Sequence, residues 1–579
     1  MLGGPLFQRE CLTAPRQAKH FFLRAGYIAA LFVLIYTARQ TIFSWQSVRT
    51  IGDAAGFGGL VFNVLAVVQL TLVLAAALLF CSGNIAQEKD RRTLILLLMT
   101  DLKDRELVGG KLLASLLSVA TLIGVSLPVF CFLSLLGGVG LDQILWFEAL
   151  CIASALAAGT WGTLVAMWRE KTFQTLAITV LGAVLWVGMA EGVVAVTGND
   201  SVIGQIASAC DPFRTLGDIL NPLGRHPELD APGVSAAKPV GILLGLSAFL
   251  FSFTVLRLRI WNPSRSIFEF VQAAENEDKT VVDERAHARV IWNNPIIWRE
   301  ICTRAYGKRV IFIKLAYFVL AGFALIYLSQ TAGSSGLVLG LISREAFVFL
   351  ALSLMSLLLI NAQAVTALTN EKDGQTLELL LVTNVTAQEF VFGKLGGIFY
   401  NAKEVFLVPL LFLIKYQLSG SLAAENAFYV FIGYFTLAGF SAMLGMHSGL
   451  SHDRSRTAIA NSLGTIFFLF IGMFICMMLM VEARASFAMQ FAPFLLFILG
   501  GSLGLWASLT HRNPSPALTL AAGLLPFCTF YAITGFLLGN TLGVCLFVAG
   551  AYGFTALAML IPAVSEFDVA LGRSGGGKG

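Results

Sequence analysis

The chain has 579 residues, of which 57% are hydrophobic and only 13% are charged. Because an average soluble domain carries about 25% charged residues, this composition excludes an ordinary soluble protein. Apolar runs of roughly 18 to 25 residues recur along the chain, and each is long enough to cross a hydrocarbon core of about 30 Å. A β-barrel would instead show segments of about ten alternating residues. The sequence therefore predicts an all-α polytopic membrane protein.

The net charge of +5 is explained by the placement of the basic residues. If the N-terminus is cytoplasmic, most Lys and Arg residues fall on the inner side, as the positive-inside rule expects. The basic residues left on or near the outer side are Arg39, Arg49, Arg214, Arg225, Lys238, Arg344, Lys415 and Arg484. We therefore expect a multi-pass protein of the plasma (inner) membrane with both termini in the cytoplasm. Membrane lipids are its surroundings, and no nucleic acid is expected as a partner.

The first half of the chain, residues 1–256, is predicted to hold six spans. An amphipathic entry segment from Gly4 to Lys19 comes first, and the spans follow near 21–38, 60–86, 112–137, 147–168, 173–197 and 239–256. The outer connection 198–238 is broken by Gly and Pro residues that favour turns. Its apolar stretch Val202–Ala209 could dip into the outer leaflet, and an ordinary exposed loop is the alternative. Residues 257–293 form a charged cytoplasmic linker.

The second half, residues 294–510, repeats this order. An entry segment at 294–309 precedes spans near 310–330, 346–369, 395–418, 427–449, 458–480 and 488–510. Residues 511–579 add two spans, near 516–537 and 541–562, and a short cytoplasmic tail. The prediction is fourteen spans in all. Because six is an even number, both halves start on the inner side and form a parallel repeat.

One charged motif occurs in both halves, at a constant offset of 283 residues. Each copy follows the second span of its half and continues to a Glu and a Gly-Lys at matching spacing. The matched residues are Glu88, Lys89, Asp90, Thr93, Glu106 and Lys111 in the first copy, and Glu371, Lys372, Asp373, Thr376, Glu389 and Lys394 in the second. The second copy also has Gly374 and Glu378, whereas the first has Arg92 in the turn and Ile95 in place of that Glu. A cytoplasmic helix held parallel to the membrane, which a soluble partner could grip, is predicted; a solvated loop is the alternative.

The entry segments match as well. Arg9 and Glu10 follow an apolar stretch that begins at Pro5, and Trp298, Arg299 and Glu300 close the matching stretch. Proline is tolerated at a helix start because the missing N–H has no intrahelical partner there. A helix lying in the inner membrane interface is therefore predicted for each copy. A plain anchor that precedes the first span is the alternative.

Taken together, these motifs resemble those of the ABC-2 type permeases, the membrane subunits of type V ABC exporters. The second copy, from Glu371 to Leu380, is the closer match, and the entry segments are similar to the connecting helices of that family. Asp211-Pro212-Phe213 is similar to a segment that often precedes its sixth span. The resemblance covers residues 1–510 and implies a permease with two halves fused in one chain.

The resemblance also implies that ATP is hydrolysed elsewhere. Two separate ATPase subunits would bind ATP and Mg²⁺ and dock on the repeated cytoplasmic segments, so this chain is expected to be no enzyme and to bind no cofactor. The glycine-rich stretch Gly572–Lys578 lacks the Ser or Thr of a phosphate loop. The nine cysteines show no metal-ligand spacing, so no metal site is expected.

Few polar residues lie inside the predicted spans. Asn361, Gln363, Lys403 and Glu404 could line a transport path. Hydrogen bonding between helices is the alternative for the two amides, and a cytoplasmic projection of the third span is the alternative for the charge pair. An ion-coupled secondary transporter and a membrane scaffold without transport remain alternative functions. An intramembrane enzyme is disfavoured because HExxH and paired mid-span Asp residues are absent from the sequence.

Overall fold

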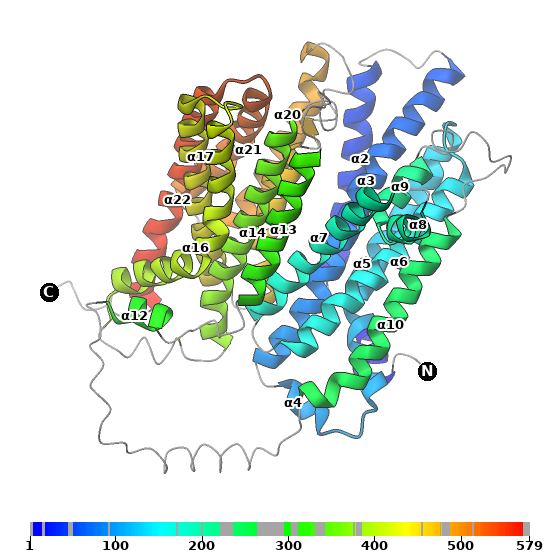
Figure 1. The fold of residues 1–579 in the computed structure, drawn as a ribbon, viewed down its shortest axis with the longest axis horizontal. Helices are drawn as coiled ribbons and strands as arrows, with labels where there is room; N and C mark the ends of the chain where they lie inside the picture. Colours follow the sequence, from blue (N-terminus) through cyan, green and yellow to red (C-terminus); the bar gives the residue numbers. More distant parts are fainter. Residues whose placement is uncertain are drawn as a thin grey trace.

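The structure is a computed structural model that describes residues 4–13, 18–43, 50–90, 93–169, 172–198, 201–220, 236–262, 294–302, 311–330, 342–373, 377, 385–452, 455–474, 476–477, 487–511 and 515–570. Every regular element in these ranges is a helix, which confirms the predicted all-α fold (Figure 1). Eleven of the described helices are long and apolar enough to cross a membrane.

The first half contains two short helices at one end, two at the other, and six long ones between them. Its helices are α1 (Gly4–Thr13), α2 (Ala18–Phe43), α3 (Ile51–Asp90), α4 (Thr93–Leu98), α5 (Asp104–Leu135), α6 (Leu141–Trp168), α7 (Thr172–Thr197), α8 (Val202–Ala209), α9 (Pro212–Leu220) and α10 (Ala237–Trp261). The connection after α7 is therefore largely helical. On α8, Val202, Ile203 and Ile206 are exposed while Ala209 is buried, so this helix presents an apolar outer face.

The second half contains the remaining helices. They are α12 (Pro295–Cys302), α13 (Ile311–Gln330), α14 (Arg344–Asp373), α16 (Ala387–Leu418), α17 (Ala424–Ser451), α18 (Ser455–Ile466), the π-helical η3 (Phe467–Gly472), α20 (Phe487–Leu509), α21 (Pro516–Leu537) and α22 (Thr541–Ala570). A helix coincides with each predicted span. The three spans outside the eleven long apolar helices are α2, α18 with η3, and α20.

Corresponding helices of the two halves have the same bounds at an offset of 283 residues. This holds for both ends of α5 and α16, for both ends of α6 and α17, and for the last residues of α3 and α14. The turn after α5 and the turn after α16 each contain a glycine with positive φ, Gly137 at 87° and Gly420 at 75°. Packing follows the same order, because α3 packs on α5, α6 and α7 while α14 packs on α16, α17 and α18.

The last helices of the chain pack differently from one another. The final helix, α22, packs along α17 and α16 as α10 packs along α6 and α5. By contrast, α20 packs against α21 and against α2 of the first half. The division of the second half into six spans at 294–510 and two additional spans at 511–579 stays a prediction.

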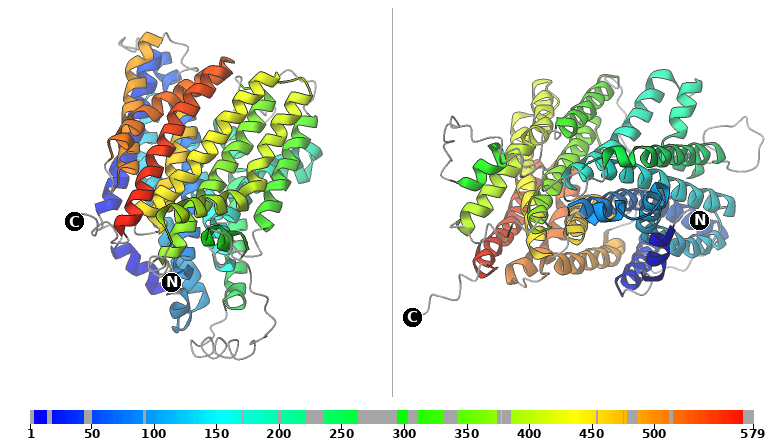
Figure 2. Two further views of the ribbon diagram at one scale, coloured as in Figure 1. Left: turned by 90° about the vertical axis from the view of Figure 1, so that its left-hand side faces the viewer. Right: turned by 90° about the horizontal axis from the view of Figure 1, so that it is seen from below.

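The two halves lie side by side, with α20 beside α2 at one edge of their junction (Figure 2). The short helices α1, α4 and α12 mark one end of the bundle, which we call the entry-helix end, and α8 and α9 lie toward the opposite, loop end, short of the ends of α2 and α20 (Figure 1). At the entry-helix end, Arg259 of α10 forms an ion pair with Asp104 at the start of α5, at 2.9 Å.

Close backbone approach fixes the crossing of the second and fourth long helices in each half. A Cβ on Gly445 of α17 would lie 2.7 Å from the carbonyl oxygen of Asn361 on α14. A Cβ on Gly162 of α6 would lie 3.1 Å from the carbonyl oxygen of Leu78 on α3, at the same offset of 283. Small residues at such contacts let membrane helices pack closely without a hydrophobic driving force.

We predict that Gly445→Ala destabilises the protein by about 1–3 kcal/mol, because the added methyl group meets backbone atoms that cannot move aside. The matched control is Gly439→Ala on the same helix, where an added Cβ meets nothing within 4 Å. Thermal unfolding of both purified variants in the same detergent measures the difference. Equal melting temperatures would show that α17 can move away from α14 without cost.

Candidate functional site

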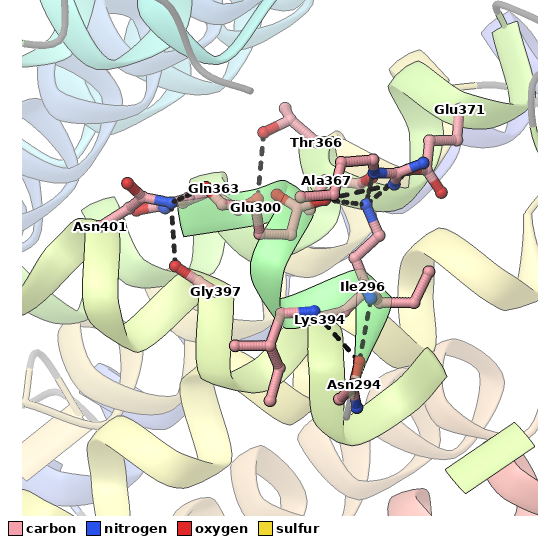
Figure 3. Close-up of polar contacts among 12 residues, drawn as sticks. Asn294, Ile296, Glu300, Gln363, Thr366, Ala367, Glu371, Lys394, Gly397 and Asn401 are labelled. Atoms are coloured by element: carbon pink, nitrogen blue, oxygen red, sulfur yellow. Dashed lines mark hydrogen bonds and ion pairs between the residues drawn. The ribbon is translucent and has the colours of Figure 1, made fainter. Parts of the chain in front are cut away.

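Four charged side chains from three helices form one network at the entry-helix end of the second half (Figure 3). Lys394 Nζ lies 2.6 Å from Glu300 Oε1 and 2.6 Å from Glu371 Oε1. Arg299 forms a further ion pair with Glu371 and lies 3.3 Å from Glu300. The Lys394 and Glu300 side chains are only 2% and 3% exposed, and Glu371 is 12% exposed. The predicted entry-segment and motif residues therefore meet, although Arg299 and Glu371 are 72 positions apart in the chain and Glu300 and Lys394 are 94 apart.

Glycines on α16 bring α12 close enough for this network to form. A Cβ on Gly393 would lie 2.8 Å from Ile296 Cβ, and a Cβ on Gly397 would lie 2.5 Å from Glu300 Cβ. Asn294 caps α12, because its Oδ1 accepts hydrogen bonds from the N–H groups of Ile296 and Ile297 at 2.9 and 3.1 Å. Its Nδ2 donates to the Glu389 carbonyl at 2.9 Å. The entry helix is thus a packed part of the site and more than an anchor for the next span; Trp298 lies half-buried on it.

The two residues after Glu371 contact two further helices. Lys372 Nζ donates to the carbonyl oxygens of Leu450 and His452, at 2.7 and 3.2 Å, where α17 ends. Asp373 accepts a hydrogen bond from the Ser455 hydroxyl at the start of α18. Three consecutive charged residues therefore join the end of α14 to α12, α16, α17 and α18.

The first half repeats part of this arrangement. Lys89 Nζ donates to the carbonyl oxygens of Met167 and Arg169 at 2.5 and 3.0 Å, each 283 positions before the acceptors of Lys372. Glu88 pairs with Lys111, but these side chains are 28% and 18% exposed, so the pair is wetter than its counterpart. Thr93 begins α4 and donates to the Glu88 carbonyl at 3.2 Å. Arg9 lies on the exposed side of α1.

The remaining motif residues have local or undescribed positions. Glu106 and Glu389 cap α5 and α16, because their carboxylates accept from the backbone N–H groups of Lys103 and Thr386 at 3.3 and 3.0 Å. Gly374, Thr376 and Glu378, and the side chains of Glu10 and Asp90, lie outside the described residues. The acidic residues of the motif are predicted to help dock a separate ATPase. Within the chain, Glu371 and Asp373 make the contacts with Lys394, Arg299 and Ser455 given above.

In the described residues of the motif, apolar side chains are exposed on α4 and in the turn that follows it. Leu96 and Met99 are 57% and 58% exposed, while Leu94 and Leu98 are buried against the bundle. Exposed apolar side chains of this kind are typical of a surface that contacts another molecule.

The four candidates for a transport path do not come together. Asn361 donates to the Ser441 carbonyl at 2.9 Å and accepts from the Ser462 hydroxyl at 2.8 Å, so it joins α14 to α17 and α18. Glu404 pairs with Lys314 of α13 at 2.7 Å. Lys403 is exposed and lies 4.1 Å from the ring centre of Tyr400. Gln363 is buried, and its amide nitrogen has no hydrogen-bond partner among the described residues.

A second polar cluster, inside the first half, was not predicted. Glu148 is buried on α6, with Gln69 Nε2 and Ser126 Oγ each 3.5 Å from its carboxylate. The Tyr27 hydroxyl donates to Gln69 Oε1 at 3.1 Å. We had placed Glu148 at the start of a span, but α6 begins at Leu141, two turns earlier. The sequence feature that could have predicted this cluster is Gln69, a polar residue in the middle of an apolar run.

This cluster belongs to the first half alone. The positions 283 residues after Gln69, Ser126 and Glu148 are Leu352, Pro409 and Phe431. In the second half, the Tyr317 hydroxyl donates to the Leu352 carbonyl at 3.0 Å. A carboxyl group among neutral partners in a membrane bundle is costly in its charged form, so it marks a functional candidate.

A cavity of about 420 Å³ lies where the two halves meet. Its walls come from α3, α6, α7 and α10 of the first half and from α14, α18 and η3 of the second. Pro212 and Phe213 of α9 line its loop end. There, Asp211 accepts from the Phe213 N–H at 2.8 Å, Arg214 pairs with Glu191 at 2.9 Å, and burial raises the pKa of Asp211 to about 6.

In comparisons with known proteins, no family model matches the chain and no curated protein is similar to it. The membrane-protein class is shown by the helices, and any finer function has to be argued from the geometry of the charge networks and the cavity.

We predict that Lys394→Met destabilises the protein by about 3–5 kcal/mol, because two buried carboxylates lose their shared cation. Lys111→Met, the equivalent change in the wetter pair, should cost about 1 kcal/mol or less. Thermal unfolding at neutral pH compares the two. Adding Glu300→Gln to Lys394→Met should recover part of the loss, since one buried charge is removed. Equal losses from the two lysine variants would mean that burial does not distinguish the networks.

Proposed function

We propose that the chain is the membrane-spanning subunit of an ATP-driven exporter of the ABC-2 type, in which two fused halves form the translocation path. One observation carries the proposal. Glu88 on α3 and Glu371 on α14 join charge networks at the entry-helix end, and nine residues before each, Leu79 and Ala362 line the cavity. At 1.5 Å per residue, each network is about 14 Å from the cavity along one continuous helix.

This arrangement suits a transporter in which a force applied at the entry-helix end changes the cavity. The networks join the second long helix of each half to the neighbouring helices, so a displacement of α12 or α16 reaches α14 directly. The side chains of α14 that line the cavity then move with it. A coupling path through packed side chains and rigid helices is the physical requirement for such transmission.

The energy source in this proposal is a pair of separate ATPase subunits, which bind ATP and Mg²⁺. The entry-helix end is then cytoplasmic, as are both termini, in the plasma (inner) membrane. The contact surface in the described part of the chain is the exposed face of α4 and the turn that follows it. Glu88 supports that surface from within by holding the helices on which it stands, and Glu371 and Asp373 hold the helices at the same end of the second half.

We predict that Leu96→Asp combined with Met99→Asp lowers association with the ATPase at least tenfold, because two exposed apolar anchors are lost. The measurement is co-purification of an ATPase subunit from membranes of the native host. Leu538→Asp is the control, since Leu538 is similarly exposed but lies in the turn before α22 at the opposite end. If no ATPase co-purifies with the unmodified chain, the proposal fails.

Ion-coupled transport is the second candidate function, and the buried Glu148 favours it. Such a transporter needs an ionisable group within the bundle, and Glu148 with Gln69 and Ser126 supplies one. A scaffold without transport would need neither this cluster nor the cavity.

We predict that Glu148→Gln keeps at least half of the ATP-driven export rate in liposomes that contain the chain and its ATPase. An ion-coupled transporter would instead lose most of its response to an imposed proton or sodium gradient, because the neutral amide cannot titrate or balance a cation. The assay follows export of the native cargo with ATP and with each gradient in turn. Gradient-driven export that Glu148→Gln abolishes would replace the first proposal by the second.

A further inference from the structure

The cavity between the halves has almost entirely apolar walls. Among the described residues that line it, none carries a charge, and the polar hydroxyls are those of Thr71 and Ser154. The Thr71 hydroxyl donates to the Val67 carbonyl at 2.8 Å, which leaves it satisfied by its own helix. An ionised ligand would lose its hydration here without gaining a counter-charge.

Ser154 differs from the other small hydroxyl residues of its helix. Thr160 and Thr163 on α6 each donate to the carbonyl four residues earlier, at 2.8 Å. The Ser154 oxygen is buried and has no hydrogen-bond partner in the part of the chain that the structure describes, and its side chain lines the cavity. A buried hydroxyl without a partner costs free energy that a ligand atom can recover.

Two tryptophans on the cavity wall are already fixed in place. The Trp161 indole N–H donates to the Thr179 carbonyl and the Trp186 indole N–H donates to the Cys210 carbonyl, both at 3.1 Å. The ring of Trp161 lies against Gly182, where an added Cβ would be 2.5 Å from it. Because both N–H groups are occupied, the indoles offer apolar ring surface to a ligand and need no rearrangement to do so.

We propose that this cavity binds an uncharged, mainly apolar molecule with a single hydrogen-bonding group, which pairs with the Ser154 hydroxyl. The inference names the substrate class of the proposed exporter and rests on that function. The binding chemistry itself concerns this chain alone. The same chemistry is found in a membrane lipid chain near its ester and in a hydrophobic cargo such as a long-chain alcohol, and the experiment separates these sources.

The test uses the full-length chain in phosphatidylcholine nanodiscs without any ATPase. Two neutral photoactivatable probes are compared: an octanol, which has one hydroxyl, and its hydrocarbon analogue. Adducts are mapped by mass spectrometry. We expect saturable labelling of Ser154–Trp161 and of the neighbouring wall of α7. Ser154→Ala should reduce labelling by the octanol about fivefold and leave the hydrocarbon unchanged, as for one lost hydrogen bond.

Cavity-filling variants provide the control for location. Ala158→Phe and Ala362→Phe fill the cavity from opposite halves, so each should abolish saturable labelling even if the other fails to fold. Ile152→Phe on the outward face of α6 adds a similar ring away from the cavity and should change nothing. Labelling that is unsaturable, or equal in the filled variants and the unmodified chain, would overturn the proposal.

Competition identifies the occupant. Displacement by short-chain phosphatidylcholine alone indicates a lipid chain, and displacement by free long-chain alcohols indicates a cargo; both outcomes support the apolar site. Equal displacement by octanoate or octylammonium would contradict an uncharged ligand. Because no ATPase is present, a positive result stands even if the chain proves to have no ATPase partner. If the chain proves to be a functional exporter but its cavity is not labelled, the proposed binding site is refuted while the proposed function stands.

Discussion

The structure of the second half depends on one buried ammonium group. Lys394 is almost inaccessible to water and shares its charge between two carboxylates from two other helices. Removing these three charges from water costs several kcal/mol per ion, and their mutual attraction offsets this only while all three stay in place. The network therefore tolerates little displacement of one helix relative to the others. It makes α12, α14 and α16 behave as one body at the entry-helix end.

In the first half, the corresponding charged pair at the same end is less buried than the Lys394 network. Glu88 and Lys111 are partly exposed, so solvent screens them and their separation costs less. The helices at the junctions increase the difference, because α20 stands beside α2 at one edge while α7 meets α13 directly at the other. The two junctions between the halves are thus built from different helices. The two halves therefore differ both in the burial of their charged pairs and in the helices at their junctions.

Much of this arrangement could be predicted from the sequence, and the exceptions have physical causes. Apolar length located a helix at every predicted span, because crossing lipid requires about 20 apolar residues whatever the packing. The repeated motif singled out Glu371 and Lys394, and the matching entry segments singled out Arg299, because charge at a membrane boundary is costly unless it is used. The sequence could not predict which residues pair with those charges. The pairing depends on how closely α12 packs against Gly393 and Gly397 of α16. The Glu148 cluster was missed because its members come from four helices and have no repeat.

Stiff and compliant helices are distributed so that motion at the charged end can alter the cavity. Neither α3 nor α14 contains proline, so each connects its network to the cavity as a nearly rigid rod. Proline interrupts α5 at Pro128 and α16 at Pro409, where a missing backbone hydrogen bond permits bending. Phe467, which also lines the cavity, begins the π-helical η3, a backbone geometry that often marks functional sites. The cavity is therefore lined both by proline-free helices and by a segment of weaker backbone geometry. If the chain is the proposed exporter, the second half, with its more buried network and its π-helical segment, is the half in which we expect the movement to begin.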